Sequence, residues 1–280
     1  MSCRQIRIER LCIDLDGPHP KRLVDDLTLT MDAGRSLAVV GESGAGKSMT
    51  ALAVMGLLPK GIRRSGGEIT VNDAITSRLD AEGWRRLRNR QVAMILQNPM
   101  SAFDPVFTIG AHFHETSSAH YPDCSRADAE GRAGAALREV GFDDPESILS
   151  IYPFQMSGGM LQRVMIALAL ATDPDFLIAD EATTDLDVRA QATILRLLAE
   201  RRRERHLGLL IITHDLSVAA EMADRTAVMH NGRLLEIGST AEIFAQPSHP
   251  YTAQLLAAHR RLYGKRFNRI RSRLEREGAK

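Results

Sequence analysis

The sequence predicts an α/β protein with a mostly parallel sheet, helices on both faces and an inserted helical block. Apolar, strand-like runs alternate with helical stretches at both ends of the chain: residues 36–40 precede one helical stretch, and residues 176–180 precede another. Such alternation is typical of parallel sheets, because parallel strands need a crossover connection between them. From about residue 100 to 160 helical stretches dominate and strand signals are few, which indicates an insertion into the α/β core.

Turn residues and periodicity place the individual elements. We expect strands over residues 6–13, 27–31, 36–40, 68–71, 176–180 and 208–215. We expect helices over residues 49–58, 127–140, 188–205 and 218–223.

Composition restricts the class of protein but does not decide it. The chain has 280 residues, of which 44% are hydrophobic and 25% charged, and its net charge of +1 gives no reason to expect a nucleic-acid partner or an acidic substrate. Cys3, Cys12 and Cys124 have neither disulfide nor metal-ligand spacing, which favours reduced thiols in a cytosolic protein. No apolar run approaches the ~18 residues of a membrane span, and the first residues lack the apolar core of a signal peptide. We therefore expect a cytoplasmic protein that reaches a membrane only through a partner.

A glycine-rich loop follows the buried strand at residues 36–40. It fits the pattern G-x-x-x-x-G-K-[ST], in which glycines let backbone N–H groups surround a phosphate chain. Lys47 would reach the β- and γ-phosphates, and the Ser48 hydroxyl would ligate Mg²⁺. A plain glycine-rich turn is the alternative, but the strand before the loop and the helix after it favour a nucleotide site. The expected nucleotide-binding residues are Gly41, Glu42, Ser43, Gly44, Ala45, Gly46, Lys47, Ser48 and Met49.

Two adjacent acids end the apolar strand at residues 176–180. An acid at a strand end often caps or faces solvent, but phosphoryl transfer needs a carboxylate that holds Mg²⁺. We assign Asp180 to that role. Glu181 is placed to orient or deprotonate the attacking water.

The segment Met156-Ser157-Gly158-Gly159 opens a further predicted helix. Ser157 could serve only as a helix N-cap. A Ser-Gly-Gly start also offers free N–H groups and a hydroxyl to an anion. With the glycine-rich loop and the acid pair, this segment resembles the signature [LIV]SGG-x-x-[QKR] of the ABC (ATP-binding cassette) ATPases, with Met156 as a mild departure. The resemblance implies that Ser157, Gly158 and Gly159 contact the γ-phosphate held by a second ATPase subunit.

Three more family motifs are present, in the order along the chain that the family shows. Gln97 matches the Q-loop glutamine, which contacts Mg²⁺ and water and signals to the membrane subunit. Residues 184–187 match the D-loop, which brings Asp187 to the nucleotide. His214 matches the switch histidine that senses the γ-phosphate. The resemblance thus implies an ATPase with ATP and Mg²⁺ as cofactors, in which Glu181, His214 and Gln97 are catalytic, and Ser48, Gln97 and Asp180 hold the metal.

The resemblance covers about residues 5–258. It implies a P-loop NTPase core with a helical subdomain inserted at about 100–160 and an antiparallel β element near the N-terminus. We expect one ATPase domain over residues 1–258 and a basic tail over 259–280. Such a tail is either a solvated helix face or a contact for an anionic membrane or partner.

Two departures from the family pattern have consequences. Ala182 stands where most members have proline, which adds an N–H donor and loosens the loop but leaves the acids in place. The family usually stacks adenine on an aromatic ring near the end of the first strand. No Phe, Tyr or Trp occurs between Met1 and Gly83, and His19 is the only flat ring nearby. We therefore expect weaker or less base-selective nucleotide binding.

The cargo is indicated by branch-specific stretches. Residues 97–105 (QNPMSAFDP) and 248–252 (SHPYT) resemble ATPases of peptide and nickel importers, and residues 152–163 and 257–264 resemble the nickel-import members more closely. Peptide members often carry a C-terminal cysteine cluster, which this chain lacks after Cys124. Nickel or a metallophore complex is therefore favoured over peptides.

The implied partners are two membrane permeases, a second and usually different ATPase, and a solute-binding protein that joins through the complex. The chain would lie peripherally on the cytoplasmic face of the membrane. Non-transport ABC ATPases are the alternative class. Those of translation carry two cassettes, and those of chromosomes separate the motifs by long coiled coils. A small-molecule kinase would leave the signature unexplained. His112 and His114 are expected to be surface residues, not metal ligands.

Overall fold

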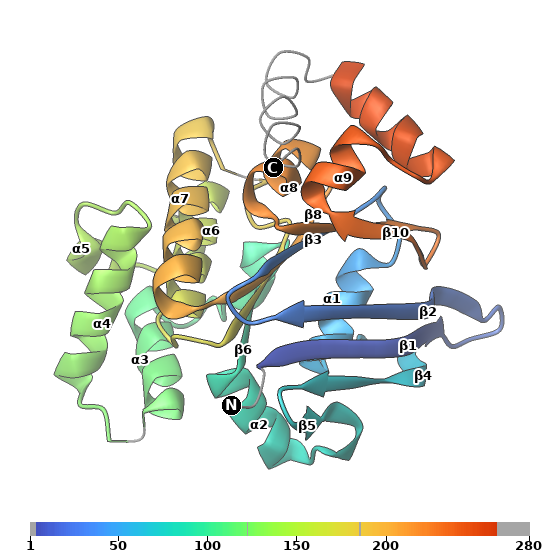
Figure 1. Ribbon diagram of the computed structural model, residues 1–280. Coiled ribbons are helices and arrows are strands. Elements are labelled where there is room, and N and C mark those ends of the chain that lie inside the picture. The colour runs from blue at the N-terminus through green and yellow to red at the C-terminus, as the bar shows by residue number, and fades with distance from the viewer. Residues whose placement is uncertain (1–3, 122, 185, 262–280) are drawn as a thin grey trace. The chain divides into compact units, whose positions relative to one another are not determined.

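The computed structural model describes residues 4–121, 123–184 and 186–261 (Figure 1). The chain forms two compact units. The first combines the residues up to Asp80 with those from Gly208 onward, and the second is Ala81–Leu207. The second unit begins before the helical block expected at about residue 100, because it also contains two strands of the α/β core.

The first unit holds two sheets and the helices that flank them. Its elements are β1 (Gln5–Leu15), β2 (Lys21–Asp32), β3 (Ser36–Val40), α1 (Lys47–Met55), β4 (Ile62–Val71), β5 (Ala74–Ile75), the short 3₁₀ helix η1 (Thr76–Arg78), β8 (Gly208–Thr213), α8 (Leu216–Met222), β9 (Arg225–His230), β10 (Arg233–Ser239), α9 (Thr240–Ala245) and a helix over residues 250–261.

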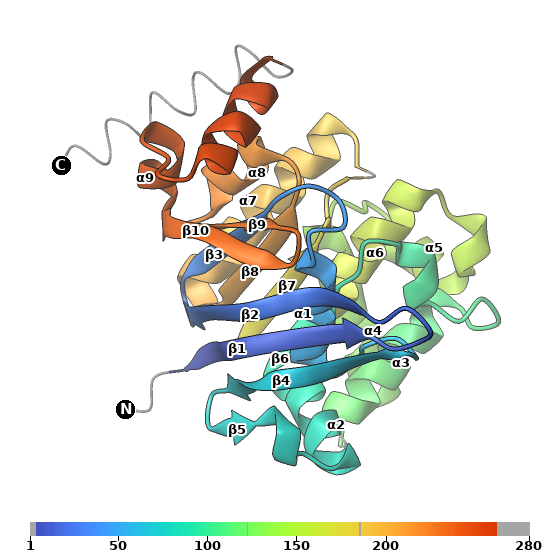
Figure 2. The same cartoon turned by 90° about the vertical axis from the view of Figure 1, so that its right-hand side faces the viewer.

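The first sheet is antiparallel, in the order β2-β1-β4-β5. Figure 2 shows β2, β1 and β4 side by side, with α1 next to them. Alternate residues of β1, such as Ile6 and Ile8, are buried, as expected for a sheet with one covered face. β1 and β2 are longer than the sequence predicted because they pair as one hairpin almost to its turn, with Leu15 opposite Lys21.

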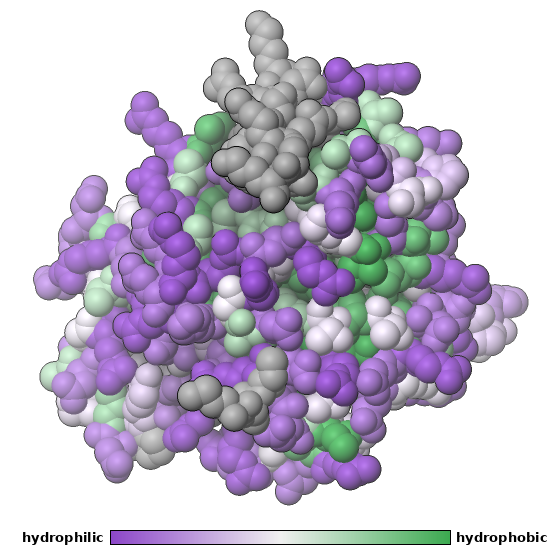
Figure 3. Space-filling model, in the orientation of Figure 1, coloured by the Kyte–Doolittle hydropathy of each residue, from purple (hydrophilic) through white to green (hydrophobic). Residues whose placement is uncertain are grey.

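The second sheet of this unit contains β10, β9, β3 and β8, in that order. β3 runs parallel to both β8 and β9, whereas β10 is antiparallel to β9. Every residue of β3 and of β8 is buried. Strands that are apolar throughout and buried on both faces are typical of parallel sheets covered by helices. Figure 3 shows apolar side chains over β10, whose middle residues are only half-buried.

The second unit holds one parallel strand pair and most of the helices. Its elements are α2 (Ala81–Arg90), β6 (Val92–Ile95), the 3₁₀ helix η2 (Pro99–Ala102), α3 (Ile109–His120), α4 (Arg126–Glu139), α5 (Pro145–Ser150), the 3₁₀ helix η3 (Pro153–Gln155), α6 (Gly158–Leu170), β7 (Phe176–Asp180) and α7 (Val188–Arg205).

The helices α3, α4 and α5 pack together as the expected helical block (Figure 1). On α4 the buried residues Ala129, Ala133, Ala136 and Leu137 recur at helical spacing and form one apolar stripe. Phe113 of α3 is 2% exposed and is one of the largest fully buried side chains of this unit.

Helix boundaries follow capping residues more than periodicity. The helix expected over 49–58 is observed as α1, which ends at Met55. Gly56 has a left-handed φ of 62° and its N–H donates to Ala53 O, which stops the helix before Pro59. The strands at 36–40 and 176–180 and the helix at 188–205 have the predicted bounds. None of the described helices is long and apolar enough to cross a bilayer. The tail from residue 262 onward and Cys3 lie outside the described residues.

Candidate functional site

The glycine-rich loop is held closely against the first unit. A Cβ atom at Gly41 would lie 2.1 Å from Met229 O, and one at Gly46 would lie 2.8 Å from Leu23 O. Gly44 has open space around it but a φ of +81°, which L side chains rarely adopt. Close contacts require glycine at positions 41 and 46, whereas at position 44 the backbone conformation requires it. The loop therefore has a cradle shape that only glycines can form.

The first turn of α1 supplies donors to that cradle. Gly46 is the N-cap residue of α1, and as a glycine it has no side chain to cap the helix. A helix N-terminus leaves backbone N–H groups without helical partners and carries partial positive charge, so it suits an anion. The Thr50 hydroxyl donates to Gly46 O at 3.0 Å and fixes the start of the helix.

Lys47 lies across the loop and is only 6% exposed. Its Nζ donates to Gly41 O at 2.8 Å and to Glu42 O at 2.9 Å. A buried ammonium group is stable only with such hydrogen bonds. The same group, at the centre of the loop, is a donor that a phosphate oxygen can compete for.

Strand register places His214 beside the loop. The Cα partner of Val40, the last residue before Gly41, is Thr213, the last residue before His214. The two segments therefore leave neighbouring parallel strands at the same sheet edge, where ligands of open α/β sheets bind. His214 is exposed at this edge.

The second unit brings three predicted site residues to one strand edge. Ala179 of β7 pairs with Ile95 of β6, so Asp180, the last residue of β7, and Gln97, just after β6, lie at the ends of neighbouring strands. Asp180 is 4% exposed, whereas Gln97 is exposed. Glu181 has a left-handed φ of +51°, which turns the chain sharply directly after Asp180. The two acids thus lie in different environments, one in the core and one on the loop.

The loop after Glu181 is braced from two sides. The Thr184 hydroxyl donates to Glu181 Oε2 at 3.0 Å. Gln162 Nε2 donates to Ala182 O at 2.9 Å, and Gln162 is 1% exposed. This second bond joins the helix of the Ser-Gly-Gly segment to the acid loop. No local sequence pattern predicts this bond, because Gln162 and Ala182 are 20 positions apart.

Ser157 and Asp187 both cap helices. Ser157 Oγ accepts from Met160 N at 3.3 Å and starts α6, with the Ser-Gly turn exposed. Asp187 Oδ1 accepts from Arg189 N and Ala190 N and starts α7. The Ala190 N–H is the largest cause that lowers the pKa of the Asp187 carboxyl, so Asp187 is ionised at neutral pH. Asp185 of the same motif lies outside the described residues.

Taken separately, each unit carries chemistry suited to a nucleoside triphosphate. The first has a glycine cradle, a helix N-terminus and a lysine for phosphates. The second has a buried carboxylate beside an exposed amide, and both are oxygen ligands of the kind Mg²⁺ prefers. No group of three or more His, Cys, Asp or Glu that could hold a metal occurs among the described residues.

Comparison with known proteins decides which NTPase this is. A family model described as "ABC transporter" matches residues 24–184, more than half of the chain. The chain belongs to the ABC transporter ATPase family. The expected family and fold class are thereby confirmed.

Relatives extend the match over almost the whole chain. The nickel import ATP-binding protein NikD of Rhodospirillum rubrum is 47% identical over 92% of this chain and 96% of its own length. NikD of Brucella abortus is 46% identical over 96% of this chain and all of its own length. The dipeptide transport ATP-binding protein DppD of Haemophilus influenzae is 42% identical over 86% of this chain and 73% of its own.

Solved structures agree on the fold. The dimeric ABC transporter cassette MJ0796 superposes with a TM-score of 0.77 at 24% identity, over 84% of this chain and 98% of that one. The ATP-binding subunit of another ABC transporter gives a TM-score of 0.72 at 27% identity, over 96% of this chain and 98% of its own.

The end of β1 lacks the aromatic ring common in ABC ATPases. Leu15 ends the strand and is 36% exposed. An aliphatic side chain gives adenine an apolar surface but no ring to stack on.

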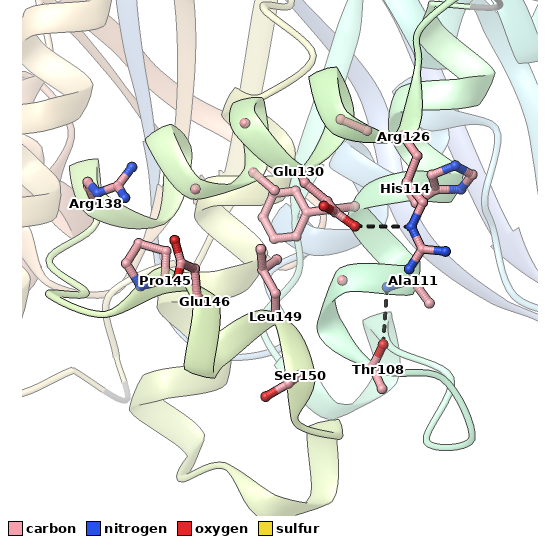
Figure 4. Close-up of a pocket in the computed structure, with 16 residues that line it drawn as sticks. Thr108, Ala111, His114, Arg126, Glu130, Arg138, Pro145, Glu146, Leu149 and Ser150 are labelled. Carbon is pink, nitrogen blue, oxygen red and sulfur yellow. Dashed lines mark hydrogen bonds and ion pairs between the residues drawn. The ribbon is translucent and has the colours of Figure 1, made fainter.

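A cleft of about 750 Å³ lies within the helical block, between α3, α4 and α5 (Figure 4). Its walls are mixed in character: Leu149 and Pro145 are apolar, while Arg126 and Glu130 pair across one turn of α4 at 3.0 Å. Thr108 accepts from Ala111 N and caps α3 at one end of the cleft. No sequence motif predicted this cleft, because its lining comes from three helices.

Proposed function

We propose that this chain is the ATP-hydrolysing subunit that energises an importer of nickel or a related metal complex. The observation that carries this proposal is the 47% identity to a nickel import ATP-binding protein over nearly the full length of both chains. The stretch at residues 257–264 supports it too, since it resembles nickel-import members.

Dipeptide or oligopeptide import is the second candidate. The dipeptide transport relative is 42% identical, but the match covers only 73% of its length. The absence of cysteine after Cys124 also favours metal over peptide. The ATPase subunit does not touch the cargo, so the two candidates share all the chemistry that follows.

In the proposed mechanism, ATP binds at the glycine-rich loop and Lys47 exchanges its bonds to the loop carbonyls for the β- and γ-phosphates. Ser48, Gln97 and Asp180 are the residues that would hold Mg²⁺, which would neutralise phosphate charge when bound. Glu181 orients or deprotonates the attacking water, and His214 contacts the γ-phosphate. The Glu181–Thr184 hydrogen bond keeps the carboxylate directed along its own loop until a water competes for it.

The signature residues Ser157, Gly158 and Gly159, with Asp187, are proposed to act on the nucleotide of a second ATPase subunit. Ser157, Gly158 and Asp187 are exposed and Gly159 is half-buried, which fits contact with a partner. We assign residues 1–258 to the ATPase domain, with the helical subdomain inserted at about 100–160, and residues 259–280 to a basic tail, whose first residues still belong to the helix over residues 250–261. Two permeases, a non-identical second ATPase and a solute-binding protein complete the importer. The helical block would bind a permease, and the chain would lie on the cytoplasmic face of the inner membrane.

Cargo is tested on the assembled transporter in proteoliposomes. ATP hydrolysis should rise when the solute-binding protein carries Ni²⁺ and should not respond to dipeptides. Stimulation by dipeptides without a response to Ni²⁺ would replace the nickel proposal with the peptide one. Independence of hydrolysis from either cargo would contradict the importer itself.

A further inference from the structure

We propose that His259, on the C-terminal helix, is a positioning residue for hydrolysis that holds the loop carrying His214 in place. This inference rests on the proposed role of His214 at the γ-phosphate. His259 lies beyond the residues that match the family model, which end at 184. His259, the His214 loop and the glycine-rich loop all belong to the first unit.

His259 is buried against the start of α8. Its ring is 7% exposed, and its Nε2 lies 3.2 Å from Ser217 Oγ and 3.6 Å from Asp215 Oδ1. Ser217 is 2% exposed, so the histidine and the hydroxyl satisfy each other away from water. A buried imidazole is unusual unless its polar atoms have such partners.

The residues that His259 contacts are those that fix the His214 loop. Asp215 is the N-cap of α8 and accepts from Ser217 N at 2.7 Å. Its own N–H donates to Thr213 Oγ1 at 3.0 Å. His214 therefore lies between Thr213 and Asp215, which are joined to each other, and Asp215 Oδ1 lies 3.6 Å from His259 Nε2.

The same helix is also anchored near the glycine-rich loop. At its start, Ser248 N and His249 N donate to Glu236 of β10 at 2.7 and 3.1 Å. The Tyr251 ring packs on His230 with centroids 4.1 Å apart. The turn that follows His230 reaches the loop, because Gly232 N donates to Ala45 O at 3.1 Å.

Burial, followed by the negative charge of Glu42 in the glycine-rich loop, raises the pKa of Tyr251, which agrees with a phenol held beside that loop. The helix over residues 250–261 thus braces two segments that carry phosphate-contacting residues, one at each end. At one end Tyr251 packs on His230, and the turn after His230 bonds the loop; at the other end His259 contacts the His214 segment. A small shift of this helix would move His214 relative to Lys47, and misplacement of this kind lowers hydrolysis more than binding.

The test uses the full 280-residue chain and single-turnover hydrolysis of ATP, with protein in excess. His259→Ala should lower the hydrolysis rate constant about five- to tenfold, the effect of one or two lost hydrogen bonds, and change ATP affinity less than about twofold. His259→Gln should recover most of the rate because its amide can still bond Ser217. Gln254→Ala, an exposed change on the same helix, and Leu256→Ala, a buried one, control for surface and packing effects.

The decisive comparison is made in a His214→Ala background. If His259 acts through His214, His259→Ala should there change the remaining rate less than about twofold. The same fold loss in both backgrounds, or a loss matched by Leu256→Ala at equal melting temperature, would overturn the proposal. So would an unchanged rate in folded His259→Ala. If that variant does not fold, Ser217→Ala removes the same bond and must give the same pattern.

The proposed role of His214 and the positioning role of His259 can be refuted separately. Unaltered hydrolysis in the His214→Ala protein would contradict the proposed role of His214, whatever the His259 variants do. Slow hydrolysis in His214→Ala, with additive loss from His259→Ala, would leave the function intact and refute only the positioning role.

Discussion

Two glycines of the same loop should differ in what they tolerate, because they are glycine for different reasons. Gly41 has a φ of +151° and a hypothetical Cβ 2.1 Å from Met229 O. Gly44 has a φ of +81° and no atom within 4 Å of such a Cβ. Alanine at Gly44 should therefore suffer backbone strain alone. Alanine at Gly41 should suffer strain and a collision with another strand's backbone.

The magnitudes follow from these contacts. Left-handed backbone at an alanine costs about 1–2 kcal/mol, part of which is offset by the smaller entropy of the unfolded chain. We expect Gly44→Ala to lower the free energy of unfolding by about 1 kcal/mol. At Gly41 a Cβ needs at least 3.0 Å, so the loop or β9 must move by roughly 1 Å. Overpacking of this kind adds about 1–3 kcal/mol, so Gly41→Ala should lose about 3 kcal/mol.

Urea denaturation followed by circular dichroism measures both variants against the natural chain. Binding of a fluorescent ATP analogue reports whether the loop keeps its shape. Gly41→Ala should unfold at a much lower urea concentration than Gly44→Ala and bind nucleotide more weakly. Free energies of unfolding that agree within about 0.5 kcal/mol for the two variants would refute the claim that contact with Met229 O determines glycine at position 41.

Four further outcomes test the rest of the reasoning. Glu181→Gln should keep ATP binding and slow hydrolysis about 10²–10⁴-fold, and near-normal turnover would remove its role as general base. ATP and GTP should bind with similar affinity, because Leu15 offers no ring; strong ATP selectivity in a titration would contradict this. Burial is the main cause that lowers the pKa of His259, so the unfolded chain takes up the proton first and stability should fall below about pH 6.5. His259→Gln should lose less stability than the natural chain between pH 8 and 5.5, and equal losses in urea midpoint would contradict this. Hydrolysis by the isolated chain should be slow, should rise with protein concentration and should rise again when partner subunits are added; full turnover by a monomer would exclude a two-subunit site.

Ser157 has two roles that can be tested separately, since it is both a helix cap and a proposed phosphate contact. Its loss should destabilise α6 by about 1 kcal/mol as a cap, whereas its effect on hydrolysis should require the second ATPase.

Local sequence patterns determined several parts of this protein in advance. The strands at 36–40 and 176–180 and the helix at 188–205 were predicted with their observed bounds. Both strands are buried along their whole length, so their sequences are almost entirely apolar and easy to recognise. Asp187 is the N-cap that marks the start of the helix. The glycine-rich loop could also be located from the sequence, because its pattern is made of consecutive residues in the chain.

Tertiary structure alone decided what lies beside these segments. The pairing of Val40 with Thr213 brings His214 to the edge where the loop begins, and Met229 O makes glycine necessary at position 41. Two hydrogen bonds likewise join distant residues: Gln162 bonds Ala182, 20 positions away, and His259 bonds Ser217, 42 positions away. Each of these contacts depends on strand register or helix packing, which no local pattern encodes. Motifs therefore identified the chemical groups, and long-range packing set the geometry in which they are held.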